Sequence, residues 1–397
     1  MTRSKTDIMI AGGGVAGLTA AAAFGHAGFN VTIIDPAPPI IAQDDAGADL
    51  RTTAFLQPAR AFLTKAGMWD RLAPFATPLQ TMRIIDAAQD PVISRDFNAD
   101  DISDAPFGWN LPNWLIRREL VETLQSLPNV DFRAGVGFTA MLPRLNENIV
   151  TLDDGSQFGA QLVIGADGRN SVVRQAAGIN VKTTRYGQKA LVFAVTHDAP
   201  HNNVSTEIHQ KGGPFTLVPL PDFEERPCSA VVWMADGTDI VALAAMDDAS
   251  FADAATKRSA DQLGPLTVVS KRGMWPIISQ VATSLIAQRT ALVAEAAHVM
   301  PPIGAQGLNM SLADLDCLLT LAQTHSSDLG GDAMLDAYQK ARHGDIKLRV
   351  RGIDALNRTS IAGGPLTHSL RGLGLKALHD VAPVRKGLMS LGLGARS

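Results

Sequence analysis

Apolar positions near the N-terminus follow the order expected of a buried strand, a glycine turn and a helix. Residues 8–10 are apolar, residues 12–17 are rich in glycine, and an alanine-rich stretch continues to about Ala27. A second apolar run over residues 31–34 ends at Asp35, and prolines follow it. This succession predicts the strand–helix–strand unit that opens a parallel, doubly wound sheet.

The central part of the chain changes between helical spacing and short alternating runs. Residues 58–72 and 114–127 predict helices, whereas residues 79–96 and 130–158 predict short strands with a turn at Asp154-Gly155. Residues 190–243 alternate between apolar and polar side chains and contain Pro-Gly turns. This pattern predicts a mostly antiparallel sheet. A buried strand is expected over residues 285–293 and a helix over residues 308–323.

These elements predict an α/β (α+β) fold with a discontinuous Rossmann-like domain. That domain takes residues 1–78, 107–185 and 276–345, and an antiparallel β-sheet domain of residues 79–106 and 186–275 is inserted into it. Residues 346–397 form a helical tail in this division.

Composition excludes several classes of protein. With 46% apolar residues among 397 the chain is globular, and a net charge of −4 gives no case for binding nucleic acid. Two cysteines, Cys228 and Cys317, provide neither a disulfide framework nor a metal-ligand pattern, which favours a reducing, cytoplasmic setting and no metal site.

The N-terminus has some features of a signal peptide, because Arg3 and Lys5 precede an apolar run. Asp7 and the glycines argue against that interpretation, and the strand ending at Asp35 favours a folded domain. No apolar run approaches the ~20 residues that a membrane-spanning helix needs.

The first candidate motif is the glycine turn Gly12-x-Gly14-x-x-Gly17. Glycines allow a tight turn and a close backbone approach, and the helix that follows presents free N–H groups to a pyrophosphate. Asp35, about 20 residues on, is placed to accept hydrogen bonds from ribose hydroxyls. The motif predicts dinucleotide binding and leaves NAD and FAD as alternatives.

The second motif is Asp167-Gly168 at the end of a predicted strand, followed by Arg169. Taken alone it is an ordinary Asp-Gly turn. In this position it resembles the Asp-Gly fingerprint of flavoprotein aromatic hydroxylases, in which the carboxylate holds a cofactor donor. The resemblance favours FAD over NAD.

The third motif is a Pro–Gly loop that leads into a helix. Negative charge on a reduced flavin would be favoured by the N–H groups and the dipole at that helix start. We expect Asn309 to bond the same flavin edge, and His298 to support the loop rather than act as a base. The residues that match the motif are His298, Pro301, Pro302, Gly304, Gln306, Gly307, Asn309 and Asp314.

Across nearly its whole length the chain resembles the FAD-dependent hydroxylases of ubiquinone biosynthesis, a branch of the para-hydroxybenzoate-hydroxylase-like monooxygenases. The matching segments include Asp49-Leu-Arg51, which in the family reaches the flavin, and Arg117 at a helix start. The nearest type is the 2-polyprenyl-6-methoxyphenol hydroxylase.

The resemblance implies that NAD(P)H reduces FAD and that O2 then forms a C4a-hydroperoxide, which hydroxylates the ring of a polyprenylated phenol. It places Pro302, Gly304 and Gln306 near the reacting ring and identifies no acid or base. Cofactor contacts are expected from Gly12, Gly14, Gly17, Asp35, Arg51, Arg117, Asp167, Gly168, Glu295, Pro302, Gly304, Gly307, Leu308 and Asn309.

Two positions depart from the family pattern. Ala294-Glu295 stands where Gly-Asp is usual, so the carboxylate that would bond the ribityl chain is one methylene longer. Gly304-Ala305 replaces the commoner Ala-Gly order. Two alternatives therefore stay open, a hydroxylase of a small soluble phenol or benzoate and a non-catalytic flavin-binding subunit of a biosynthetic complex.

Charge is concentrated at the C-terminus. From Lys340 onward there are 11 Lys and Arg against 3 Asp and Glu, although the whole chain carries −4. Leu366, Leu370 and Leu373 have helical spacing with basic residues between them. This pattern fits either a helix lying on the inner face of an anionic membrane or helices packed on the core.

Overall fold

The computed structural model describes residues 3–87, 91–210, 212–361, 386 and 389. One of its sheets has eight strands, which come from three parts of the chain. Its main path runs in the order β18 (Ile286–Ala287), β19 (Thr290–Leu292), β11 (Gln157–Gly165), β1 (Ser4–Ala11), β2 (Val31–Asp35) and β8 (Val130–Ala134). From β19 to β8 every pairing is parallel. The hairpin of β9 (Phe138–Pro143) and β10 (Asn148–Leu152) is added through β11.

The register of these parallel strands aligns their carboxyl ends. Ala11 at the end of β1 pairs with Gly165 of β11 and Ile34 of β2, and Gly165 pairs in turn with Leu292 of β19. Because the loops after parallel strands leave the same edge of a sheet, the segments after these four strands meet there.

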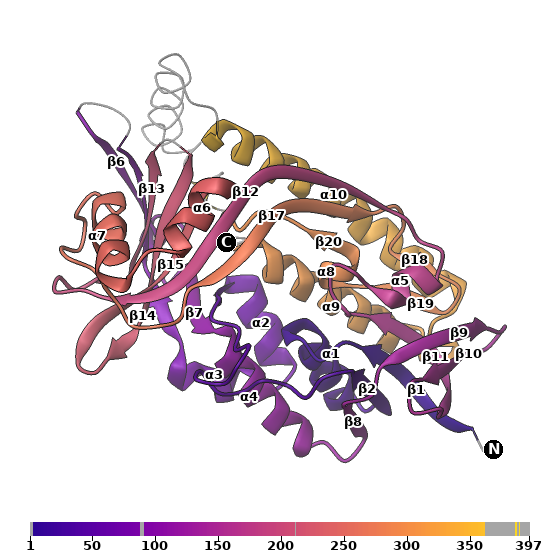
Figure 1. Cartoon of the computed structure of the whole chain (residues 1–397). Helices are drawn as coiled ribbons and strands as arrows, with labels where there is room; N and C mark the ends of the chain where they lie inside the picture. The colour runs from indigo at the N-terminus through magenta and orange to yellow at the C-terminus, as the bar shows by residue number, and fades with distance from the viewer. Residues whose placement is uncertain (1–2, 88–90, 211, 362–385, 387–388, 390–397) are drawn as a thin grey trace.

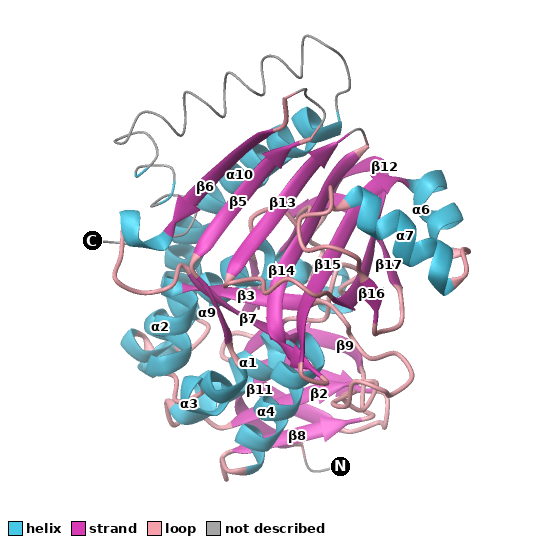
Figure 2. Ribbon diagram, turned by 90° about the vertical axis from the view of Figure 1, so that its left-hand side faces the viewer, coloured by secondary structure: helices cyan, strands magenta, loops and turns pink. Residues whose placement is uncertain are grey.

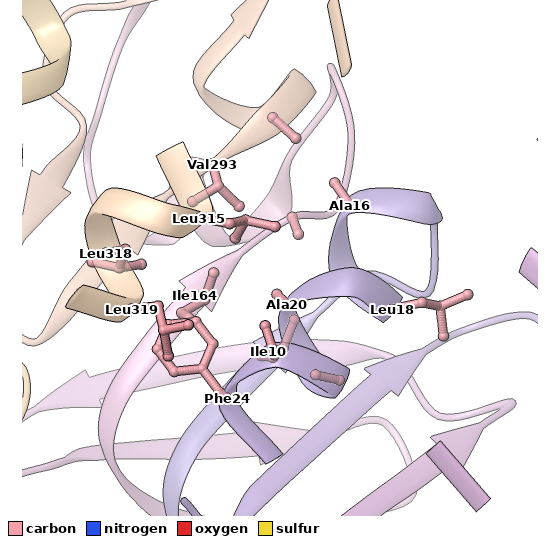
Figure 3. Packing of buried hydrophobic residues seen from close by; sticks show 14 of the residues in the cluster. Ile10, Ala16, Leu18, Ala20, Phe24, Ile164, Val293, Leu315, Leu318 and Leu319 are labelled. Atoms are coloured by element: carbon pink, nitrogen blue, oxygen red, sulfur yellow. The ribbon is translucent and has the colours of Figure 1, made fainter. Parts of the chain in front are cut away.

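Helices α1 (Val15–His26) and α9 (Gln306–Thr324) pack together against this sheet. Figure 3 shows Phe24 and Ala20 of α1 beside Leu315 and Leu319 of α9, over Ile10 and Ile164 of the strands. Most residues of α1 are alanine or glycine, and these small side chains let the helix lie close to the strands. Eleven of its twelve residues are buried as a result. This packing holds the first and third motifs against each other.

The predicted helix over residues 58–72 is divided into two. α2 (Gln57–Lys65) and α3 (Trp69–Leu72) are separated by Gly67, whose φ of +72° lies in the left-handed region that ends helices. Three further helices occur in the segments that contain the strands of the parallel sheet: α4 (Asn113–Gln125), α5 (Val172–Ala176) and α8 (Ala294–Ala297).

A second, nine-stranded sheet is antiparallel at every pairing except the one between β5 and β13. Its strands are β20 (His298–Val299), β17 (Gly273–Ala282), β12 (Val181–Thr196), β15 (Arg226–Asp236), β14 (Gly213–Phe223), β13 (Val204–Gln210), β5 (Thr81–Asp86) and β6 (Ile93–Asn98), with β16 (Thr267–Val268) beside β12. In Figure 1 the long strands β12 and β17 run from this sheet toward the parallel sheet. The predicted α/β fold with an inserted antiparallel sheet is confirmed.

The two faces of the nine-stranded sheet have different neighbours. Helices α6 (Gly237–Ala244) and α7 (Asp248–Arg258) cover one face, here called the outer face, through a core cluster that includes Ile208 and Phe251 (Figure 2). On the opposite, inner face, Met82 and Val218 join a small cluster with residues of β3 (Thr52–Leu56). β3 belongs to a three-stranded sheet with β7 (Gly108–Pro112) and β4 (Thr77–Leu79).

Helix α10 (Asp332–Ile361) is one continuous helix that runs through residue 346, where the predicted tail begins. It contacts the nine-stranded sheet, where Tyr186 donates a hydrogen bond to Asp354 at 2.5 Å and Asn357 donates one to Gln188 at 3.1 Å. Among the described residues, none of the helices combines the length and the apolarity that crossing a bilayer requires. The leucine pattern at residues 366–373 lies outside the described residues.

Candidate functional site: the loops at the carboxyl edge of the parallel sheet

The glycine turn after β1 is close-packed on one side and open on the other. Gly12 has a φ of +115°, and a Cβ there would lie 2.4 Å from the carbonyl oxygen of Ala166. A Cβ at Gly17 would lie 1.8 Å from the carbonyl oxygen of Gly12. By contrast, a Cβ at Gly14 would meet nothing within 4 Å, and Gly14 is the N-cap of α1 without a side-chain cap. The free N–H groups of α1 therefore begin beside open space, as anion binding requires.

Asp35 lies at the end of β2, next to this turn. Its Oδ2 accepts a hydrogen bond from the N–H of Gly13 at 2.5 Å, and its Oδ1 accepts one from the N–H of Ala37 at 2.9 Å. Each carboxylate oxygen has a second acceptor position. The half-buried side chain thus retains acceptors for ribose hydroxyls while its position is fixed by the backbone.

Asp167 follows β11 and has one oxygen satisfied and one unsatisfied. Oδ2 accepts hydrogen bonds from the N–H groups of Val172 and Val173, at 2.7 and 3.1 Å, and so holds the start of α5. Oδ1 is buried and has no hydrogen-bond partner. A Cβ at the neighbouring Gly168 would meet nothing within 4 Å. Because a buried, unpaired carboxylate oxygen is unfavourable, Oδ1 fits a donor group of a bound molecule.

A buried carboxylate organises the arginines predicted to reach the cofactor. Asp49, 5% exposed, accepts two hydrogen bonds from the Arg51 guanidinium, both at 2.8 Å, and one from Asn113 at 3.0 Å. Arg117 lies 3.8 Å away, with a buried Nε that has no partner. Burial by itself would raise the pKa of Asp49, but the hydrogen bonds and charge of Arg51, with Asn113 and Arg117, outweigh burial and lower that pKa.

Arg51 also connects the two sheets. Its guanidinium lies 4.4 Å from the ring centroid of Trp275 on β17, and its Nη1 lies 3.8 Å from Oε1 of Glu295. The other Glu295 oxygen lies 3.7 Å from Nε of Arg169. The structure therefore brings Glu295 together with arginines that follow β11 and precede β3, and the Glu295 side chain stays 41% exposed.

The loop before α9 takes an unusual backbone conformation. Gly304 and Ala305 have φ values of +64° and +54°, and Ala294, ahead of Glu295, has +53°. The left-handed backbone region costs alanine roughly 1–2 kcal/mol. This cost explains why the family that the chain resembles usually has glycine at the positions of Ala294 and Ala305. Pro302, Gly304 and Gly307 are exposed, and a Cβ at Gly307 would meet nothing within 4 Å. The loop is thus open on the side where a ring system is expected.

The Asn309 side chain bonds to three backbone groups in the structure. Its Oδ1 accepts from the N–H of Leu56 at 2.9 Å, and its Nδ2 donates to the carbonyl oxygens of Ala54 and Ala305, at 2.7 and 2.6 Å. The hydrogen bonds of the Asn309 side-chain amide to Leu56 and Ala54 connect α9 to β3. Asn309, like Leu308, then has its backbone N–H in the first turn of α9 as the group left for a cofactor.

His298 lies in a buried ion network beneath the loop. Its Nε2 lies 2.6 Å from Oδ2 of Asp314, and the two side chains are 1% and 0% exposed. Asp314 also accepts a hydrogen bond from Arg342 of α10 at 2.8 Å. Burial would lower the pKa of Arg342, but the charge of Asp314 outweighs it and raises that pKa. The supporting role predicted for His298 agrees with this arrangement, whereas no sequence signal linked Arg342 to the loop.

Comparisons with known proteins add independent observations. The model of the FAD binding domain family matches residues 5–351. Over 98% of its length the chain is 32% identical to the ubiquinone hydroxylase UbiL of Rhodospirillum rubrum, covering 89% of that protein. It is 27% identical to the 3-demethoxyubiquinol 3-hydroxylase of Escherichia coli, with 99% and 100% of the two chains covered.

Solved structures share the fold. The p-nitrophenol 4-monooxygenase PnpA of Pseudomonas putida aligns over the full length of both chains, with a TM-score of 0.81 and 17% identity. PqsL of Pseudomonas aeruginosa, solved with 2-aminobenzoylacetate, aligns over 90% of this chain and 97% of PqsL, with a TM-score of 0.77 and 21% identity.

Proposed function

The chain belongs to the FAD binding domain family, and from that membership we propose that it is an FAD-dependent monooxygenase, which uses NAD(P)H and O2 to hydroxylate the aromatic ring of a polyprenylated phenol in ubiquinone biosynthesis. The observation that carries this proposal is the meeting of four loops from distant parts of the chain at one edge of the parallel sheet. Similarity over almost the whole length to a ubiquinone hydroxylase supports the substrate class.

The residues at this edge fit FAD. The N-terminus of α1 and the open space at Gly14 suit a pyrophosphate, and Asp35 suits the ribose of the adenosine half. Asp167, with its unpaired Oδ1, and Glu295 suit the ribityl and flavin donors. We assign the flavin ring to the open side of the loop at Pro302 and Gly304. When bound and reduced, FAD would supply the electrons that activate O2, one atom of which would be transferred to the aromatic ring while the other leaves as water.

The remaining roles belong to positioning and to the exclusion of water. The Arg51–Asp49 pair, stacked on Trp275, holds a positive charge between the two sheets. The N–H groups at the start of α9 would stabilise negative charge on the reduced flavin ring. Met82 and Val218 pack with residues of β3 and with Ala305 of the loop in one apolar cluster, and such apolar side chains beside the loop would help to exclude water from the reacting atoms.

We also propose a peripheral contact with an anionic membrane, through which a lipid-soluble phenol would arrive. On α10, Leu348 and Leu356 are 71% and 58% exposed, and exposed Lys347 and Arg351 lie beside them. Exposed apolar and basic side chains on one helix suit an anionic bilayer surface. Truncation after Ser360 removes only Ile361 from this helix, so sedimentation with anionic liposomes separates the contribution of α10 from that of residues 361–397.

A substrate comparison tests the proposed function. FAD-loaded protein is supplied with NAD(P)H and with a prenylated phenol, a short phenol or a benzoate, and product is measured by mass spectrometry. The proposal expects hydroxylated product from the prenylated phenol at the highest kcat/KM. Hydroxylation of only the short phenol or the benzoate would assign the enzyme to soluble substrates, and no product from any of them would contradict a monooxygenase.

A further inference from the structure

A buried asparagine lies where the three-stranded sheet meets the nine-stranded sheet. Asn110 of β7 is 0% exposed, and its Nδ2 donates a hydrogen bond to the carbonyl oxygen of Pro219 on β14 at 2.9 Å. This carbonyl lies beyond the end of the β13–β14 pairing, whose last pair is Thr206 with Leu217. At that point β14 therefore bonds to β7 instead of β13, and β7 lies against β14 in Figure 2.

The two polar atoms of the Asn110 side chain have different surroundings. A backbone carbonyl can only accept a hydrogen bond, so the atom that faces Pro219 is the nitrogen and the other is Oδ1. Oδ1 is buried and has no hydrogen-bond partner among the described residues, Thr77 opposite Asn110 on β4 included. Because a buried acceptor without a donor is unfavourable, Oδ1 is suited to an O–H group of a bound molecule.

Strand register puts Asn110 beside the loop that precedes α9. Asn110 lies opposite Ala54 of β3, and cross-strand partners share a face with about 5 Å between their Cβ atoms. Ala54 and Ala305 of the loop pack in one apolar cluster, and the carbonyl oxygen of Ala54 accepts a hydrogen bond from Asn309. A single strand, β3, thus separates Asn110 from the loop to which the flavin ring is assigned.

An accessible apolar surface adjoins this position. Met82 of β5, Val218 of β14 and Ala305 of the loop pack on the cluster and are half-buried. Ala54 and Ala305 carry only methyl groups, and Met82 is a flexible side chain that adapts to a bound group. Sites for small molecules are mostly apolar with a few placed polar groups, and this surface with Asn110 beside it has that composition.

A second asparagine has the same hydrogen-bond deficit at a different place. Asn148 of β10 is also 0% exposed, and its Nδ2 donates to the carbonyl oxygens of Gln288 and Arg289 at 3.3 and 3.1 Å. Its Oδ1 is likewise buried without a partner among the described residues. Asn148 pairs with Ala160 of β11 in the parallel sheet and not with the strands around the loop. The place in the fold therefore distinguishes Asn110, and Asn148 is its matched control.

We propose that Asn110 Oδ1 accepts a hydrogen bond from a ring hydroxyl of the phenol substrate and thereby positions the ring beside the loop; this inference rests on the proposed function. A neutral amide accepts the bond without removing the proton, so Asn110 is a positioning residue and takes no part in proton transfer. A site with a buried acceptor discriminates against a molecule that lacks the donor, because the acceptor then stays unpaired. Asn110 therefore selects rings that carry a free hydroxyl.

Binding to the oxidised, FAD-loaded protein tests this assignment without requiring turnover. A prenylated phenol and its deoxy analogue, in which hydrogen replaces the ring hydroxyl, are titrated while the change in flavin absorbance is followed. Wild type is compared with Asn110→Leu, Asn110→Ala and the control Asn148→Leu, and circular dichroism and flavin retention report folding. Hydroxylated product is measured separately with NAD(P)H and O2.

The inference expects wild type to bind the phenol about tenfold or more tightly than the deoxy analogue. In Asn110→Leu and Asn110→Ala the preference falls to within about twofold, through weaker binding of the phenol, whereas Asn148→Leu keeps the wild-type preference.

Two results would overturn the inference. One is the absence of a preference in wild type, which indicates that Oδ1 of Asn110 binds only water. The other is an unchanged preference in the Asn110 variants, or an equal loss of preference in Asn148→Leu, which indicates that the amide only joins β7 to β14. A preference in wild type without hydroxylated product would instead refute the proposed function and leave Asn110 as a binding group for the hydroxyl.

Discussion

Replacement of Asp167 by alanine separates cofactor binding from local folding. One oxygen of this carboxylate receives the N–H groups of Val172 and Val173, and the other is buried without a partner. Loss of the first role removes a helix cap, worth about 1 kcal/mol. Removal of the unpaired oxygen offsets part of that cost in the protein without FAD. With FAD bound, the same oxygen has a donor, and its loss costs about 1–3 kcal/mol, or roughly 5–150-fold in Kd.

The measurement is a flavin titration of the variant together with denaturant unfolding of the FAD-free protein. Ser171→Ala is the matched control, because buried Ser171 caps the same helix by accepting a hydrogen bond from the N–H of Arg174 at 2.9 Å. We expect this control to lower the free energy of unfolding by about 1 kcal/mol and to leave the flavin Kd within about twofold. Equal loss of flavin affinity in the two variants, or no loss in Asp167→Ala, would refute the assignment of the unpaired oxygen.

Three further predictions concern the surroundings of the site. Gly14→Val should fold but lose FAD, because the valine side chain would occupy the open space assigned to the pyrophosphate. Gly17→Ala should fail to fold, because its Cβ would lie 1.8 Å from the carbonyl oxygen of Gly12. Flavin absorbance measures FAD retention and circular dichroism measures folding in both variants. The pKa of Asp49 is lowered in the folded protein, so its contribution is present above the unfolded pKa of about 4 and is lost as pH falls through the folded value. Asp49→Asn should therefore flatten the acid dependence of the unfolding free energy, and an unchanged slope would contradict the ion pair. Arg342→Ala should lower the free energy of unfolding by about 3 kcal/mol, because it leaves the buried Asp314 carboxylate without its arginine partner. In the same urea titration, Arg349→Ala, which removes a more exposed ion pair with Asp345, should lower it by about 0–1 kcal/mol.

Local sequence signals predicted the parts of the fold that depend on neighbouring residues. Apolar spacing, together with glycines that a close backbone approach explains, predicted the glycine turn, its strands and a helix over residues 308–323, which the structure extends to residues 306–324. The break between α2 and α3 at Gly67 was not predicted, because a glycine inside a helical pattern is often tolerated.

Contacts between distant segments could not be predicted from spacing. The parallel pairing of β5 with β13 joins strands more than one hundred residues apart, and it is this pairing that puts Asp86 beside His209. Asn309 has the residue type expected for a flavin contact, but its amide is used by β3, which only the tertiary structure brings near. Arg342 is likewise connected to Asp314 through helix packing alone.

Incorporation of labelled oxygen tests the central claim most directly. FAD-loaded protein, NAD(P)H and a prenylated phenol are incubated under isotopically labelled dioxygen, and the product is examined by mass spectrometry. The account predicts one labelled oxygen atom on the aromatic ring, and loss of that product in Gly14→Val, which lacks the cofactor. Product whose new oxygen comes from water, or NAD(P)H oxidation that yields only hydrogen peroxide, would contradict it.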